Sequence, residues 1–119
     1  MEFTPVERAV LEWCANHAAC AELAAQFRAA TPTKRKYTGV GSYTDLSIPT
    51  GLPLVPLHAI PRGSHGPIYG PDIAAVELES GACSQVYCEG GALSFLEIAA
   101  YSNSFPEHLS GVVLTPPAE

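Results

Sequence analysis

Asp45 and Glu97 are the residues of this sequence whose type and position most suggest chemistry. Each is the single acid of a segment with the composition of a β-strand, Tyr37–Leu46 and Gly90–Tyr101. Burying an unpaired charge is costly, so each carboxylate needs a partner. Two carboxylates that converge across a sheet could act as general acid and general base, which would make the protein a hydrolase. The alternative is pairing with a tyrosine hydroxyl or an arginine, and this structural interpretation is the one we favour.

The other residue types that carry chemistry are scattered. No Cys-x-x-Cys or His-x-x-x-His pair offers a metal site, and the four histidines lie far apart (His17, His58, His65 and His108). No Gly-x-Ser-x-Gly elbow presents a serine nucleophile. The glycines of Thr38–Gly41 are followed by neither a helix nor Gly-Lys-Ser/Thr, so they form no phosphate-binding loop. We therefore predict no catalytic residue, no metal and no cofactor, and favour a protein that is not an enzyme.

Tyrosine accompanies both acids. Tyr43 precedes Asp45 by two residues and so shares its side of a strand, and Tyr101 follows Glu97 in the second segment. Tyrosine is amphipathic and is enriched at protein interfaces. We therefore take Tyr43, Asp45, Glu97 and Tyr101 as candidate binding residues.

The net charge of −6 narrows the classes of partner. Nucleic-acid phosphates require a basic surface, which an acidic chain lacks, whereas a basic protein would be attracted by electrostatic steering. The first hypothesis is thus a non-enzymatic protein that binds a protein partner in an immunity-like or regulatory role. The alternatives are a small-molecule-binding domain, with Asp45 and Glu97 anchoring a pocket between helices and sheet, and the hydrolase.

Length and composition indicate one domain over residues 1–119. No run approaches the ~20 apolar residues of a membrane span, and no basic-then-apolar leader is present, so we expect a cytoplasmic protein without membrane contact. Cys14 and Cys20 would lie roughly 9 Å apart along a helix, and Cys83 and Cys88 about 16 Å apart along a strand. Neither local pair can close a disulfide, so reduced thiols are expected.

The N-terminal part, residues 4–30, has helical signals. Thr4, Pro5 and Glu7 fit a capping box with proline in the first turn. An apolar stripe follows at three-four spacing, interrupted near His17, which predicts a bend or two short helices. Pro32 ends the helical region.

Residues 36–115 are predicted to be β-rich. Residues 36–48 alternate as one strand, whose two glycines would let another backbone or a ligand approach closely, and the basic residues 34–36 would be a solvated linker. A Pro/Gly-rich loop occupies residues 49–71, with an irregular edge strand at 52–60. Residues 73–78 form a short strand, with Val76 and Leu78 pointing inward after Ala74, and residues 111–115 a last one.

The most regular β signal is a hairpin formed by residues 84–89 and 92–101. Gly90 and Gly91 fit a two-residue turn with positive φ. Counting from that turn places Val86 opposite Phe95 and Ser84 opposite Glu97. Both faces of the hairpin are largely apolar, so we expect a central hairpin covered on both sides. The resulting fold is α+β, with one or two N-terminal helices packed on an antiparallel sheet of about four to six strands.

Two motifs carry a resemblance: a Thr-Gly-Val-Gly-x-Tyr-Thr-Asp strand at 38–45 and a Leu-Glu-x-x-x-Tyr-x-x-x-Phe-Pro-Glu segment at 96–107. In this order the chain resembles a family of small uncharacterised bacterial proteins, over most of its length. The resemblance implies the fold and a bacterial origin. It implies no activity, because no established activity is known for that family.

Overall fold

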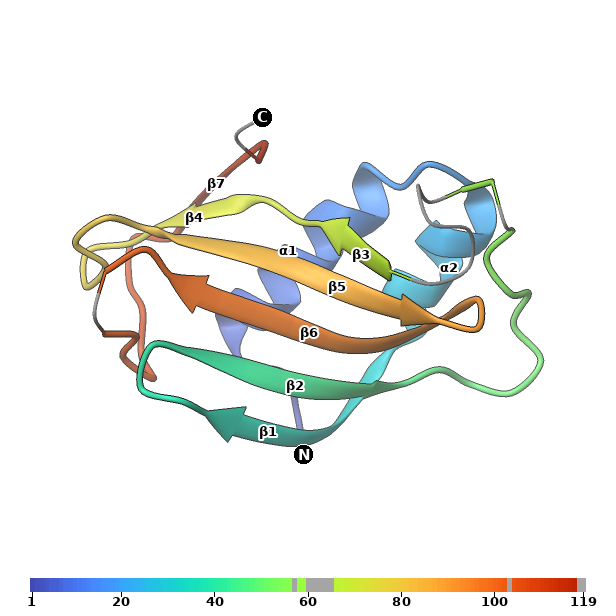
Figure 1. Cartoon of the computed structure of the whole chain (residues 1–119), viewed down its shortest axis with the longest axis horizontal. Coiled ribbons are helices and arrows are strands. Elements are labelled where there is room, and N and C mark those ends of the chain that lie inside the picture. Colours follow the sequence, from blue (N-terminus) through green and yellow to red (C-terminus); the bar gives the residue numbers. More distant parts are fainter. Residues whose placement is uncertain (57, 60–65, 103, 118–119) are drawn as a thin grey trace.

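The computed structural model describes residues 1–56, 58–59, 66–102 and 104–117. Two N-terminal helices pack against one face of an antiparallel sheet that has seven strands in this part of the chain (Figure 1). The α+β class predicted from the sequence is confirmed. The sheet contains more strands than expected because two of them, at its margin, are only three residues long.

The helices form where the sequence predicts them. α1 spans Pro5–Asn16 and α2 spans Ala21–Ala29. The capping box is complete, since the Thr4 hydroxyl accepts from the Glu7 amide at 3.3 Å and the Glu7 carboxylate accepts from the Thr4 amide at 2.9 Å. The predicted interruption near His17 separates the two helices.

The first strand prediction was wrong in one respect, because residues 36–48 are not one strand. β1, Thr31–Tyr37, and β2, Gly41–Ser47, form an antiparallel hairpin whose turn contains Gly39 at φ +91°. The basic residues 34–36 therefore lie in β1, at the edge of the sheet, and not in a linker. The three-residue turn continues the alternation of the two strands, so the sequence pattern hides it.

The close backbone approach predicted at these glycines is confirmed at Gly41. A Cβ placed on Gly41 would lie 2.0 Å from the carbonyl oxygen of Ile98 in the neighbouring strand. Only glycine leaves room for that contact. The absence of a side chain at Gly41 thus allows the start of β2 to pair closely with the strand that contains Ile98.

The remaining strands follow in the order β3, Gly66–Tyr69; β4, Asp72–Ala74; β5, Ala82–Glu89; β6, Ala92–Ala100; and β7, Val113–Thr115. Across the sheet the order is β1-β2-β6-β5-β4-β7, and β3 pairs with β5 on the same side as β4. The β5–β6 hairpin is therefore central, as predicted, with the turn at Gly90-Gly91.

The register of this hairpin differs from the one predicted by counting residues from the turn. Glu89 does pair with Ala92, but the pairing shifts between Tyr87 and Cys88, so that Tyr87 lies opposite Phe95 and Val86 opposite Leu96. β6 has one extra residue near the turn, which forms a β-bulge. Beyond the bulge, each residue of β6 lies on the face opposite to the one predicted from the sequence. Phe95 and Glu97 consequently face away from the helices.

Three further expectations need correction. The hairpin is covered on one side only, since both helices lie behind the sheet in Figure 1. Val76 is not buried, because strand β4 ends at Ala74 and the chain turns there, although Leu78 is buried. Residues 52–56 and 58–59 form no strand, and positions 57 and 60 lie outside the described residues.

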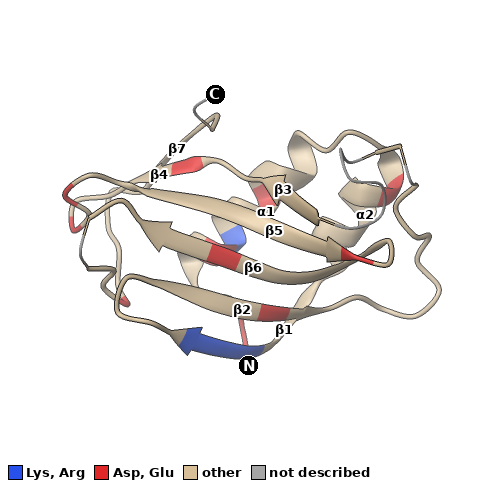
Figure 2. Ribbon diagram, in the orientation of Figure 1, with Lys and Arg blue, Asp and Glu red and all other residues tan. Residues whose placement is uncertain are grey.

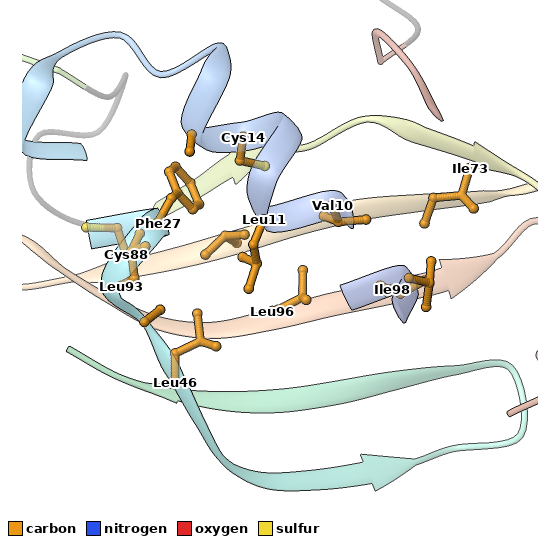
Figure 3. Close-up of a cluster of buried hydrophobic side chains, with 14 of the residues drawn as sticks. Val10, Leu11, Cys14, Phe27, Leu46, Ile73, Cys88, Leu93, Leu96 and Ile98 are labelled. Carbon is orange, nitrogen blue, oxygen red and sulfur yellow. The ribbon is translucent and has the colours of Figure 1, made fainter. Parts of the chain in front are cut away.

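The hydrophobic core fills the space between the helices and the inner face of the sheet (Figure 3). Val10 and Leu11 of α1 and Phe27 of α2 pack toward the strands. From the sheet come Val86 and the other inward residues of β2, β4, β5 and β6, including Leu46, Ile73, Cys88, Leu93, Leu96 and Ile98. This one-sided core leaves the opposite face of the sheet uncovered.

Candidate functional site

The uncovered side of the sheet, called here the outer face, brings the sequence candidates together. Tyr43 and Asp45 of β2 lie beside Phe95 and Glu97 of β6, since Tyr43 pairs with Glu97 and Asp45 with Phe95. The outer face also includes Lys34 and Lys36 of β1, Gln85 and Tyr87 of β5, Tyr69 of β3, Asp72 of β4 and Tyr101. All four candidate binding residues are thus on one surface.

An aromatic row crosses the middle of the outer face. Phe95 stacks on Tyr87, with ring centroids 5.3 Å apart and planes within 3° of parallel. On its other side Phe95 meets Tyr43 at 6.0 Å in a tilted arrangement. Such pairs are favourable beyond their buried area, and they hold the three rings in place while leaving Tyr43 42% exposed.

Glu97 is held in place by its neighbours on both sides. It accepts a hydrogen bond from the Gln85 side-chain amide. A hydrogen bond with Glu97, together with the charge of that carboxylate, raises the pKa of the Tyr43 hydroxyl, so Tyr43 remains a neutral donor. Glu97 therefore has the tyrosine partner that the structural interpretation predicted.

Asp45 has no such partner among the residues that the structure describes. It lies across from Lys34 on one side and Phe95 on the other. The only ion pair among residues 1–56, 58–59, 66–102 and 104–117 joins Arg35 to Glu7, which lies on the inner side of the sheet. Within that part of the chain the acids of the outer face are therefore not neutralised by contact with a cation.

Charge is distributed unevenly over the outer face (Figure 2). The basic residues are confined to the β1 edge, while acids occur singly on β2, β6 and β4 and at the end of β5. Four inter-strand steps separate β1 from β4, or about 19 Å at the usual strand spacing. That distance exceeds the Debye length of about 8 Å, so the β1 lysines do not offset the charge of the acid on β4.

A hollow of about 670 Å³ opens at the acidic side of this face, beside the C-terminal segment. Asp72 accepts a hydrogen bond from the Tyr101 hydroxyl at 2.9 Å. That hydrogen bond, with a smaller contribution from burial, raises the pKa of Tyr101 to about 12. The described lining consists of Tyr69, Gly70, Asp72, Cys83, Ser84, Gln85, Tyr101, Pro116 and Pro117.

The inner face carries polar groups of a different kind. Glu7 is 2% exposed and accepts from the Arg35 Nε at 2.8 Å and from the Thr44 hydroxyl at 2.6 Å. Burial alone would raise the pKa of the Glu7 carboxyl, but these hydrogen bonds, the Thr4 amide and the charge of Arg35 outweigh it and lower the pKa. This site joins α1 to β1 and β2, which is a structural role.

The predicted pocket between helices and sheet exists, but without its predicted anchors. A hollow of about 280 Å³ lies between the helices and β3, lined by Trp13, Phe27, Ile68 and their neighbours. Asp45 and Glu97 do not line it, because they point away from the helices. Cys14 does line it, and burial raises the pKa of this thiol to about 12, which removes its reactivity as a nucleophile.

The residues that the structure describes offer no group of three His, Cys, Asp or Glu side chains able to hold a metal ion. Of the four scattered histidines, His65 lies outside the described residues. The four cysteines are free. No helix within the described ranges is both long and apolar enough to span a membrane.

Sequence reasoning missed much of the outer face. Phe95, Tyr87 and Gln85 were assigned to no site, because the bulge at the hairpin reverses which residues share a side. Asp72 and Tyr69 were missed because nothing in their local sequence links them to Tyr101. Tyrosines at alternating strand positions were the available signal, but their mutual proximity depends on strand pairing.

Comparisons with protein-family models, with curated proteins and with solved structures found no match to this chain. The family resemblance therefore stays a prediction.

Proposed function

We propose that this protein binds a protein partner of basic character through the outer face of its sheet. The observation that carries the proposal is the aromatic row of Tyr43, Phe95 and Tyr87, which is left uncovered and is bordered by Asp45 and Glu97. Fixed aromatic residues with a polar border are the composition found at protein interfaces.

The partner's expected chemistry follows from the charges. The acids of the outer face lack cation partners in the described part of the chain, so arginine or lysine from a partner can pair with them. Arginine also stacks on aromatic rings, which suits the central row. The β1 lysines would meet acidic or neutral groups at the partner's margin and thereby set its orientation.

The size of the face sets the expected strength. Four strand spacings and a strand length of seven residues give a surface of roughly 20 by 23 Å. That is roughly 500 Å², below the about 800 Å² that each partner contributes to a standard interface. We therefore expect a reversible complex, as suits a regulatory or immunity-like role in which the protein covers a basic surface of its partner.

The test begins with basic proteins encoded beside the gene for this chain. Each is purified and titrated calorimetrically with the wild-type protein. We expect one of them to bind, and to bind at least about tenfold more weakly as salt rises from about 50 to about 300 mM, because the paired charges become screened.

Matched variants decide whether the outer face is responsible. Asp45→Asn/Glu97→Gln removes two charges from it and should weaken binding at least about tenfold. Glu12→Gln/Glu22→Gln removes two charges from the helices and should leave affinity unchanged. Equal effects of the two double variants would show that net charge alone drives binding, and retention of affinity by the first would reject the outer face.

Small-molecule binding is a second candidate, favoured by the hollow between the helices and β3. Its volume is near the lower limit of ligand pockets, and its lining is largely apolar. A thermal-shift screen against a broad metabolite set tests it, since a ligand raises the melting temperature by mass action. A flat profile would reject this function. The hydrolase has no comparable support, because its two acids lie on an open surface.

A further inference from the structure

We infer that the hollow beside Asp72 receives the guanidinium group of an arginine side chain from the protein partner. The inference rests on the proposed function, because it names the group by which the partner would be held. It concerns a different set of residues from the aromatic row, however, and can be tested without any partner.

The charge of the hollow selects a cation. Asp72 is the one charged residue among the described residues that line it, and neither lysine nor arginine is among them. The lysines of the outer face lie at the opposite edge of the sheet. A cation in the hollow therefore meets a carboxylate whose charge no basic neighbour in that lining reduces.

Hydrogen bonding keeps that carboxylate available. The Tyr101 hydroxyl donates to Oδ1 of Asp72, and the raised pKa of Tyr101 keeps the phenol neutral at physiological pH. Asp72 is thereby oriented by a neutral donor and not by a cation. Gln85 is held similarly, since its amide nitrogen donates to Glu97 and its amide oxygen remains an acceptor.

The lining favours a planar cation over a compact one. Tyr69, which is 67% exposed, and Tyr101, which is 57% exposed, offer ring surfaces beside the carboxylate. A guanidinium group stacks on such rings while donating in a fork to a carboxylate, whereas an ammonium is a strongly hydrated point charge. Gly70 adds no side chain there, and a Cβ at that position would lie 2.5 Å from the Ser84 hydroxyl.

The test uses N-acetyl-arginine amide as the probe, titrated into the isotopically labelled full chain and followed by NMR. We expect saturable shifts of the Tyr69, Gln85 and Tyr101 amides in the millimolar range. The neutral isostere N-acetyl-citrulline amide should bind at least about tenfold more weakly, the ratio expected for one charge-assisted hydrogen bond. Equal binding of the two probes, or the absence of saturable shifts, would overturn the inference.

Two variants and one control locate the contact. Asp72→Asn should weaken the arginine probe at least about tenfold, and Glu12→Gln, which removes a carboxylate from the helices, should leave its affinity unchanged. Tyr69→Leu, at an exposed position, should weaken it about threefold through loss of the ring. Wild-type affinity in Asp72→Asn would refute the site, and Tyr69→Leu keeps the test decisive if Asp72→Asn does not fold.

The outcome is separable from the proposed function. If the probe does not bind, but partner binding depends on Asp45 and Glu97, only the inference about the hollow is rejected. If the probe binds but no partner is found for the outer face, the proposed protein partner is rejected and the guanidinium site is retained.

Discussion

Polar residues have different roles on the two faces of the sheet. On the inner face, Glu7 and Gln26 are almost completely buried, and each joins elements that are distant in sequence. On the outer face, Asp45 and Asp72 are held by few contacts and face open surface or a hollow. The difference indicates that polar groups contribute to stability on one side and remain accessible on the other, the side through which we propose binding.

Hydrogen bonding makes this difference concrete. Among the described residues, every buried side-chain nitrogen or oxygen has a partner. Gln26 donates to the carbonyls of Pro53 and Gly91 and accepts from the Leu93 amide, so one side chain ties α2 to the loop after β2 and to the β5–β6 turn. Removing such a group leaves several buried partners unsatisfied.

The largest effect is expected at Glu7. Glu7→Gln leaves Arg35, which is only 14% exposed, without its counter-ion. Breaking a buried pair by removing one partner costs several kcal/mol, so we expect a loss of about 3 kcal/mol in the free energy of unfolding, measured by urea denaturation. Asp45→Asn on the outer face should change it by less than about 0.5 kcal/mol. Similar losses at both positions would abolish the contrast between the faces.

The next largest effect on the free energy of unfolding is expected at Gln26, which can be compared with Gln85 on the outer face. Gln26→Leu keeps the side-chain size but removes three hydrogen bonds, two of them buried and one partly buried, and we expect a loss of about 2–3 kcal/mol. Gln85→Leu makes the same change on the outer face, where we expect less than about 0.5 kcal/mol. Thermal and urea unfolding of both variants provide the comparison, and a larger loss for Gln85→Leu would contradict it.

A pH dependence sharpens the role of Glu7. Its folded-state pKa lies below the ordinary 4.5, so the carboxylate contributes stability that is present above about pH 4.5 and is lost as pH falls through the folded-state pKa. The difference in unfolding free energy between wild type and Glu7→Gln should therefore be constant from about pH 7 to about pH 5, and shrink below about pH 4.5. A difference that grows on acidification would show the opposite sign of pKa shift.

The smallest effect concerns Tyr43 on the outer face. Because Glu97 raises the pKa of Tyr43, Glu97→Gln should lower it, as followed by ultraviolet absorbance at alkaline pH with Tyr43→Phe identifying the signal. Asp45→Asn should leave that titration nearly unchanged, and the unfolding free energy should change by less than about 0.5 kcal/mol in both carboxylate variants. An unchanged Tyr43 titration in Glu97→Gln would show that the two side chains do not interact in solution.

Several features could be predicted because their causes are local. The capping box at Thr4 and Glu7, the break between the helices and the tight turn at Gly90-Gly91 depend on residues within a few positions of one another. The candidate residues Tyr43 and Asp45 share a side of β2 for the same reason, since side chains alternate along any strand.

Other features could not be read from the sequence, because they depend on contacts between distant segments. The bulge that turns Phe95 and Glu97 outward is fixed by the pairing of β5 with β6, and no residue type near Ser94 signals it. The turn at Gly39 was hidden because it preserves the alternation of its flanking strands. Coverage of one face only is likewise a result of helix packing.

The sequence by itself determined the class of fold, the start and end of the helical region, the acidic charge and the identity of the two strand acids. Tertiary structure alone decided that these acids share an uncovered face with an aromatic row, that Arg35 pairs with Glu7, and that Asp72 meets Tyr101, 29 positions further along the chain. The physical reason is that composition and periodicity act over a few residues, whereas a surface is assembled by strand order and register.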